Sequence, residues 1–291
     1  MRARLHKSLA SAVCRGIIVL ACSALLIPDA VARPLDDVKA SGFLRVIVYD
    51  DNAPFSWTEA DGTIKGIDAD IARAIAASMG LKPELIARIA GEEVDDDLRS
   101  NIWQGPRTGG PVGDVMMHVP MEKEFIARNN LVQISNAYYH EQTVLVLHPD
   151  LADPAKGFAA FENAKLAVHF ATTAHYYAMF VDEGRYKTSI SPYVKFASAV
   201  DAFLKRQSAG LLGRRSEIEA ALHDKDAKAV TIEPTFNTYM RMAWTIGTAV
   251  KHDSRDTGYA VGNALAEIEK SGELARIFRS YGLSYVAPPV Q

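Results

Sequence analysis

The stretch GDVMMHVPMEKEFIAR, residues 113–128, gathers side chains that could perform three kinds of chemistry. The methionine pair and His118 are candidate ligands for a soft metal ion. His118 is also of the residue type most often used as a general base near neutral pH. Arg128 carries the planar guanidinium that binds a carboxylate through two parallel hydrogen bonds. The rest of the chain decides between a metal site, a catalytic site and the wall of a ligand pocket.

The spacing of candidate ligands argues against a metal site. The eight histidines form neither an H-x-x-x-H nor an H-E-x-x-H pair. Met116 and Met117 alternate on a strand, so one is expected in the core and the other on the opposite side. The acids at 50–51 and 95–97 lack the alternation and distal glutamate of a calcium loop, and those at 95–97 fit the first turn of a solvated helix. We predict no metal and no cofactor.

Catalytic motifs are equally hard to find. The sequence has no G-x-S-x-G elbow and no histidine base with a partner at motif spacing. The glycine-rich run GPRTGGPVG, residues 105–113, precedes a strand and therefore cannot aim a helix N-terminus at a phosphate. These observations predict a protein that is not an enzyme.

Residues 1–32 have the three parts of a signal peptide. Arg2, Arg4 and Lys7 form a basic start, residues 16–27 are an apolar core, and AVA at 30–32 is a small-x-small cleavage site. We predict cleavage near Ala32 and a periplasmic mature protein. Lipidation within VLAC, residues 19–22, is the alternative.

The mature chain is expected to be acidic and free of cysteine. Both cysteines, Cys14 and Cys22, precede the predicted cleavage site, which excludes disulfides and thiolate nucleophiles. Removal of residues 1–32 leaves 28 Lys and Arg against 34 Asp and Glu, a net charge of −6. Such a balance disfavours nucleic acid and anionic lipid as partners. No further run approaches the roughly 20 apolar residues of a membrane span.

Strand and helix patterns alternate along the whole chain. FLRVIVY at 43–49 predicts a buried strand, and the apolar stripe that begins at Ile67 predicts a helix that ends at Gly80. A helix with an acidic first turn is predicted at 92–103, and two helices broken near 271–272 close the chain. This alternation indicates an α/β fold with mostly parallel sheets.

An ordered series of short motifs then points to a family. The motifs are GFLRV (42–46), APFSW (53–57), GIDAD (66–70), DVMM (114–117), ISNAYY (134–139), AVHFATT (167–173) and SGELARIFRSYG (271–282). Their order and spacing resemble the type II periplasmic solute-binding proteins of the amino-acid-binding group, from about Gly42 to Gly282.

The resemblance implies two α/β lobes joined by two crossover strands, with a central cleft that closes on a ligand. The crossovers are expected near 144–147 and 243–247. Residues 33–143 and 246–291 would then form a discontinuous lobe 1, and residues 144–245 would form lobe 2.

The same resemblance implies a set of ligand-binding residues. Arg128 stands seven positions before Ser135, where the family has its carboxylate clamp. The second-lobe acid that holds an ammonium group has no counterpart in KRQSAGLLGRR, residues 205–215. The other expected cleft residues are Asn52, Phe55, Trp57, His118 and Val119 on lobe 1 and Thr172 and Thr173 on lobe 2, where helix capping is the alternative role for the two threonines.

A narrower resemblance concerns DVMMHVP, residues 114–120. It is similar to the DVVMGVP strand of the J-type accessory proteins, which are encoded beside periplasmic quinoprotein methanol dehydrogenases. This resemblance implies a non-catalytic accessory protein whose partner is methanol dehydrogenase. The alternative is a solute receptor that delivers an amino acid or another small carboxylate to an ABC permease, and a third possibility is a dehydratase-like enzyme on the same fold.

Overall fold

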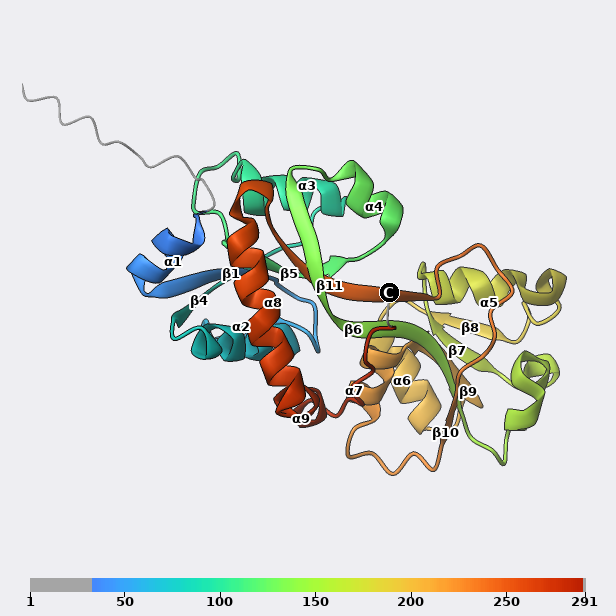
Figure 1. The fold of residues 1–291 in the computed structure, drawn as a ribbon. Coiled ribbons are helices and arrows are strands. Elements are labelled where there is room, and N and C mark those ends of the chain that lie inside the picture. Colours follow the sequence, from blue (N-terminus) through green and yellow to red (C-terminus); the bar gives the residue numbers. More distant parts are fainter. Residues whose placement is uncertain (1–32, 290–291) are drawn as a thin grey trace, which may run out of the picture.

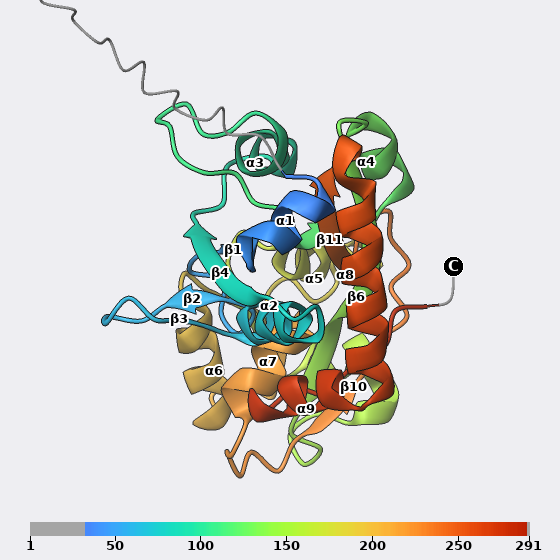
Figure 2. The same cartoon turned by 60° about the vertical axis from the view of Figure 1, so that its left-hand side comes forward.

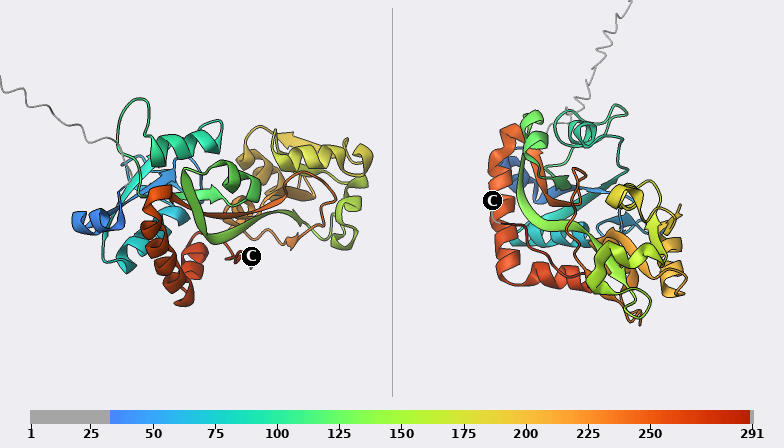
Figure 3. Two further views of the ribbon diagram at one scale, coloured as in Figure 1. Left: turned by 45° about the horizontal axis from the view of Figure 1, so that its top comes forward. Right: turned by 90° about the vertical axis from the view of Figure 1, so that its right-hand side faces the viewer.

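A computed structural model of the 291-residue chain describes residues 33–289. The predicted signal peptide and both cysteines lie outside this range. The described chain forms two α/β lobes, which lie side by side and are linked by two long strands (Figures 1 and 3). Strand order along the main path is β4-β1-β5-β11-β6-β9-β7-β8, so one hydrogen-bonded network runs through both lobes.

Lobe 1 is built on the strands at one end of this network. They are β1 (Phe43–Tyr49), β4 (Lys82–Arg88), β5 (Val115–Pro120), β11 (Ala243–Lys251) and the first part of β6 (Val132–Leu147). β1 pairs in parallel with β4 and β5, whereas β11 is antiparallel to β5 and β6. A small hairpin of β2 (Trp57–Thr58) and β3 (Ile64–Lys65) projects from the lobe.

Helices cover the sheet of lobe 1 on both faces. They are α1 (Leu35–Ser41), α2 (Ile67–Ser78), α3 (Val94–Leu98), the π-helical turn η1 (Arg99–Trp103), α4 (Lys123–Arg128), η3 (His252–Ser254), α8 (Arg255–Lys270) and α9 (Glu273–Ser280). Figure 2 shows α2 beside α8, and the two helices pack together. Because both faces are covered, Met116 and Met117 are both buried, on opposite sides of β5.

Lobe 2 repeats the arrangement on a smaller scale. Its strands are β7 (Leu166–His169), β8 (Ile190–Tyr193), β9 (Gly210–Arg214), β10 (Val230–Ile232) and the second part of β6. Its helices are the 3-10 segment η2 (Pro154–Glu162), α5 (Thr173–Gly184), α6 (Phe196–Leu204) and α7 (Arg215–Leu222). β7 is parallel to β8 and to β9, whereas β6 is antiparallel to β9.

The predicted elements at 43–49 and 67–80 are confirmed as β1 and α2, and the predicted final break separates α8 from α9 at Ser271–Gly272.

The interpretation of residues 95–97 as a solvated helical turn is wrong for Asp97. This residue is 5% exposed, and its carboxylate accepts hydrogen bonds from the Tyr49 hydroxyl at 2.8 Å and the Gly91 N–H at 2.9 Å. A buried carboxylate of this kind fixes the start of α3 against β1.

The linkage between the lobes consists of β6 and β11. β6 pairs with β11 up to Gln142 and changes partner at Thr143, which pairs with Arg214 of β9. We call residues 140–143 and 243–245 the hinge, and the lobe boundaries given above remain a prediction. Glu141 in the hinge is fully buried and accepts hydrogen bonds from Ser216 at the start of α7. Burial raises the pKa of the Glu141 carboxyl above its ordinary value.

Gly66 holds the loop after β1 against the start of α2. It has a φ of +117°, and a Cβ at this position would lie 2.2 Å from the Phe55 carbonyl oxygen. We expect Gly66→Ala to lower the free energy of unfolding by about 2–4 kcal/mol, because it combines backbone strain with a backbone clash. Urea unfolding followed by circular dichroism measures the change.

Gly62 is the matched control for this substitution. Its φ is +85°, and nothing lies within 4 Å of its Cβ position. Gly62→Ala should therefore cost only about 1 kcal/mol. Equal losses in the two variants would show that the contact with Phe55 is unimportant.

Candidate functional site

Two adjoining cavities lie near the junction of the lobes; the first is lined by lobe 2 and the hinge, and the second is lined by both lobes. The first, which we call the charged cavity, has a volume of about 390 Å³ and is lined by Thr143, His169, Ala171, Thr172, Thr173, Ala174, Gly213, Arg214, Glu217 and Trp244. The second, the apolar groove, has a volume of about 690 Å³ and is lined by Asp51, Ala53, Pro54, Trp57, Phe196, Ala197, Glu217, Ala220, Ala221 and Tyr281. Glu217 borders both cavities, so they adjoin at this side chain, and we call the two together the cleft.

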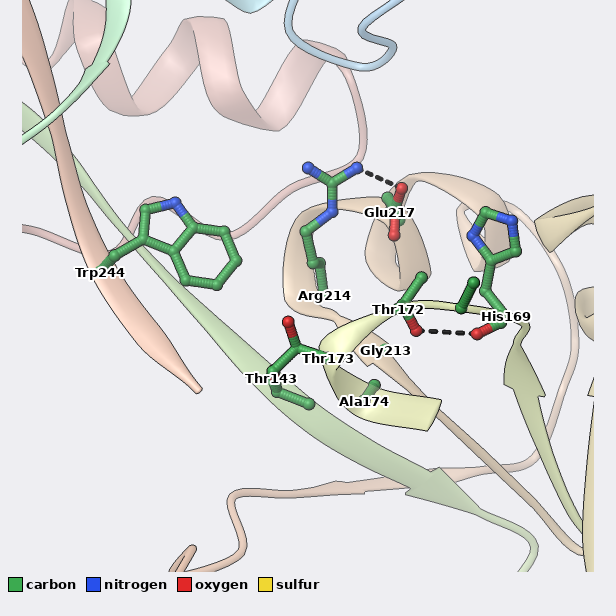
Figure 4. Close-up of a pocket in the computed structure, with 10 residues that line it drawn as sticks. Thr143, His169, Thr172, Thr173, Ala174, Gly213, Arg214, Glu217 and Trp244 are labelled. Carbon is green, nitrogen blue, oxygen red and sulfur yellow. Dashed lines mark hydrogen bonds and ion pairs between the residues drawn. The ribbon is translucent and has the colours of Figure 1, made fainter. Parts of the chain in front are cut away.

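Arg214 supplies the positive charge of the charged cavity. It is the last residue of β9, and its guanidinium donates to the carboxylate of Glu217, one turn into α7 (Figure 4). Burial lowers the pKa of Arg214, but the hydrogen bond to Glu217 and the charges of Glu217 and Glu141 raise it overall above its ordinary value. The side chain keeps 34% of its surface exposed. A guanidinium that is always charged and partly accessible can bind a carboxylate.

The N-terminus of α5 forms the opposite wall of the charged cavity. Thr172 caps this helix: its hydroxyl donates to the His169 carbonyl at 2.7 Å and accepts from the His175 N–H at 3.2 Å. The N–H groups of Thr173 and Ala174 belong to the first turn, where a helix offers donors without internal partners. These donors and the helix dipole favour an anion beside Arg214.

Trp244 completes the charged cavity from the hinge. It lies on β11, and its indole faces the cavity across from Arg214 (Figure 4). Thr143, on the paired strand β6, lines the floor beside it. Both residues belong to the segment that connects the lobes, so a bound molecule would contact the hinge directly.

The residues predicted to bind the ligand on lobe 1 do not lie together in the structure. Trp57 lines the apolar groove. The backbone N–H of Asn52 donates to the Ser56 carbonyl at 2.8 Å, which closes the turn after β1. Phe55 and Val119 are 1% and 0% exposed and belong to the hydrophobic cores. Their direct contact with a ligand remains a prediction, and their placement favours a supporting role.

His118 takes part in a buried network that its spacing in the sequence did not reveal. Its Nδ1 lies 2.9 Å from the carboxylate of Asp68, which is 0% exposed and also accepts the Tyr138 hydroxyl at 2.6 Å. Burial and the Asp68 charge raise the pKa of Tyr138 well above its ordinary value, so its hydroxyl stays a donor. The ring of His118 also meets Phe55 edge to face at 4.4 Å. The network fixes the orientation of His118 at the end of β5.

Arg128 lies away from the charged cavity. It ends α4, 56% of its side chain is exposed, and its guanidinium binds both oxygens of Asp95 at 2.8 and 2.9 Å. It also lies over the Phe125 ring at 4.9 Å. The cavity beside it is lined by residues of α3, η1 and the loop after α4, and shares no residue with the cleft. The carboxylate clamp at Arg128 therefore stays a prediction, and Arg214 is the arginine that lines the charged cavity.

Arg128 should instead control the titration of Asp95. The hydrogen bond from Arg128 lowers the pKa of Asp95 from 3.8 to about 2. Because the folded pKa is depressed, the pair stabilises the fold above about pH 4, and this contribution is lost as the pH falls toward 2. We expect Arg128→Ala to return the pKa of Asp95 to near 3.8, as measured by NMR titration of the carboxyl carbon. Arg206→Ala, on lobe 2, should leave it unchanged, and a pKa that stays near 2 without Arg128 would contradict the pairing.

Sequence reasoning did not select Glu217, Trp244 or Thr143 for the site. Arg214 lies in KRQSAGLLGRR, the stretch in which the family resemblance implies an acid that this sequence lacks. The signal available for Glu217 was its position three residues after Arg214, which is one helical turn. No sequence pattern indicated Trp244 or Thr143, because these residues reach the cavity only through the pairing of β6 with β11.

Among residues 33–289, no three His, Cys, Asp or Glu side chains are grouped as metal ligands. None of the helices in this range is long and apolar enough to cross a bilayer.

The chain is similar to known proteins in sequence and in structure. Residues 44–103 match the sequence model of the bacterial extracellular solute-binding proteins, family 3. A probable amino-acid ABC transporter periplasmic-binding protein of Sinorhizobium fredii is 39% identical over 55 residues, which are 19% of this chain and only 18% of that protein.

Solved structures match over most of the chain. The polar amino acid ABC uptake transporter substrate-binding protein of Streptococcus thermophilus has a TM-score of 0.70 at 14% identity, covering 87% of this chain and 91% of that one. An ancestral cationic amino acid solute-binding protein has a TM-score of 0.65 at 22% identity, covering 85% and 98%. The chain therefore has the fold of the type II periplasmic binding proteins, and its residues 44–103 carry the sequence pattern of solute-binding family 3.

Proposed function

We propose that the protein is a non-catalytic periplasmic solute receptor that binds a small carboxylate-bearing compound and delivers it to the permease of an ABC importer. One observation carries the proposal: Arg214 and the N-terminus of α5 converge on a cavity at the junction of the lobes. Cationic and N–H donors that face one small cavity are the requirements for holding a carboxylate. The amino-acid-binding relatives named above support this class of ligand.

Binding would be coupled to movement of the lobes. A carboxylate between Arg214 and the N–H groups of Thr173 and Ala174 would also touch Trp244 in the hinge. Lobe 1 contributes Trp57 and the loop after β1 from the other side of the cleft. Closure would bury the ligand between the lobes and present one compact surface to a permease.

Glu217 allows the ligand's charge to be tested. Its carboxylate is already neutralised by Arg214, so a carboxylate ligand must share Arg214 with it. For a ligand without an ammonium group, we expect Glu217→Gln to raise affinity about threefold or more, because Arg214 becomes fully available. Isothermal titration calorimetry measures the change, and Glu219→Gln is the control outside the cavity. A tenfold fall would instead identify an amino acid whose ammonium group binds Glu217.

The J-type accessory role is a second candidate, supported by the likeness of the β5 strand DVMMHVP to those proteins. In that role the cleft would face a segment of periplasmic methanol dehydrogenase. The dehydratase-like alternative would use His118, to which the structure gives a carboxylate partner in Asp68. The similar proteins named above favour the receptor over both, because they are amino-acid-binding proteins.

Calorimetric titration of residues 33–291 separates these functions. The titrants are amino acids, amino-free organic acids and purified periplasmic methanol dehydrogenase. Saturable binding of a small acid is the expected result. Binding of the dehydrogenase alone would replace the receptor by the accessory protein, and a lack of response to all titrants would refute both.

A further inference from the structure

The apolar groove differs in chemistry from the charged cavity that it adjoins. Lobe 1 contributes two aromatic rings, and lobe 2 contributes one aromatic ring and small apolar side chains. The groove is lined by Pro54, Trp57 and Tyr281 of lobe 1 and by Phe196, Ala220 and Ala221 of lobe 2. Its acids are Glu217, which pairs with Arg214, and Asp51, which also lines a neighbouring cavity with Thr58 and Ile89. An anionic group has no cationic partner among the residues that line this groove.

The aromatic wall of lobe 1 is held in place by bonds made within that lobe. The Tyr281 hydroxyl donates to Asp70 at 2.6 Å and accepts the Gly66 N–H at 3.1 Å. The Trp57 indole N–H donates to Glu59 at 3.1 Å. The two rings meet edge to face at 6.0 Å. Because the polar atoms of both side chains are already bonded, their ring surfaces remain for apolar contact.

The groove continues directly from the charged cavity on lobe 2. Phe196 lines the groove, Gly213 lines the charged cavity, and a Cβ on Gly213 would lie 3.6 Å from the Phe196 ring. Glu217 borders both spaces, one turn before Ala220 and Ala221 on α7. The charged cavity and the groove therefore adjoin along Gly213 and Glu217 of lobe 2.

We propose that the groove is a second subsite of the cleft, which binds the apolar body of an organic acid whose carboxylate is held at Arg214. The proposal rests on the receptor function proposed above and narrows the ligand to an alkyl or aryl carboxylic acid. A free volume of about 690 Å³, compared with about 390 Å³ for the charged cavity, gives the apolar part the larger share of the cleft. Sites of this kind use a few polar groups for orientation and apolar surface for affinity.

A homologous series of acids tests the subsite. The probes are the straight-chain alkanoates from propanoate to octanoate, together with phenylacetate and 3-phenylpropanoate, titrated by calorimetry into residues 33–291. Each methylene that enters the groove should raise affinity by roughly threefold to fourfold. We expect this rise to continue along the series and the two aryl acids to bind more tightly than propanoate.

Two variants block the groove at different places. Ala220→Trp fills the space beside α7, and Ala197→Glu places a carboxylate on the exposed start of α6. Each should lower the affinity for octanoate at least tenfold and flatten the dependence on chain length. Ala159→Glu, an exposed site on η2 outside the cleft, should change affinity less than twofold. Ala197→Glu keeps the test valid if Ala220→Trp fails to fold.

The results separate this subsite from the receptor function. Short acids that bind with no gain along the series would overturn the subsite and leave the receptor in place. A rise that persists unchanged in both variants would place the apolar body elsewhere and would also overturn the subsite. If neither these acids nor amino acids bind, the receptor function fails together with the subsite.

Discussion

Replacing Arg214 with alanine is expected to weaken the binding of a carboxylate ligand by about 30- to 150-fold, or about 2–3 kcal/mol. The guanidinium is the cation among the residues of the charged cavity, which the first turn of α5 also lines. Its removal takes away a charge-assisted pair and leaves Glu217 as an uncompensated negative charge beside the ligand. Arg214→Lys should recover only part of the loss, because an ammonium group cannot form two parallel bonds to a carboxylate.

Arg128→Ala is the matched control, since both arginines lie at the end of a regular element and pair with an acid. The family resemblance implies a clamp at Arg128, whereas we propose that Arg214 holds the carboxylate. Calorimetry on both variants, with the same acid, decides between them. A loss confined to Arg128→Ala would return the clamp to lobe 1 and contradict the charged cavity as the carboxylate site.

Removal of the Asp68 carboxylate should destabilise lobe 1 by about 3–5 kcal/mol. Asp68 accepts the Tyr138 hydroxyl and pairs with His118 of β5, and all three residues belong to lobe 1. In Asp68→Ala the Tyr138 hydroxyl, on a side chain only 1% exposed, loses its acceptor, and so does Nδ1 of His118. An unpaired buried donor costs more than the bond itself contributes. Urea unfolding of wild type and variant gives the difference.

Asp68→Asn separates the charge from the hydrogen bond. The amide oxygen can still accept the Tyr138 hydroxyl, so this variant should lose only about 1–2 kcal/mol. Asp226→Ala, at an exposed loop position, should stay within about 0.5 kcal/mol of wild type. Equal stability of Asp68→Ala and wild type would mean that the network contributes nothing to folding.

The pattern of residues along the chain was sufficient for the fold class and for most elements. Runs such as FLRVIVY and the stripe from Ile67 depend on local periodicity, and periodicity reports which face of a strand or helix is buried. The stretch AVDAFLKRQSAG, residues 199–210, predicts a helix, but α6 runs from Phe196 to Leu204 and a turn follows from Lys205. Helix ends depend on caps and neighbouring contacts, which a periodic pattern does not encode.

The order of motifs carries the family resemblance, which implied two α/β lobes linked by crossover strands, and the structural matches agree. The sequence by itself predicted a helix that starts near Thr172 or Thr173, and Thr172 caps α5 in the structure. A helix start of this kind is a local feature, so neighbours in the sequence suffice to specify it.

Only the tertiary structure decided which side chains meet. It brought Trp244 and Arg214 to one cavity, paired His118 with Asp68 from 50 residues away, and placed Arg128 against Asp95. Each of these contacts depends on strand register and on how the lobes are joined at β6 and β11. Register is fixed by the packing of both sheet faces and not by any single segment, so spacing in the sequence could identify the elements of this protein but not the composition of its cleft.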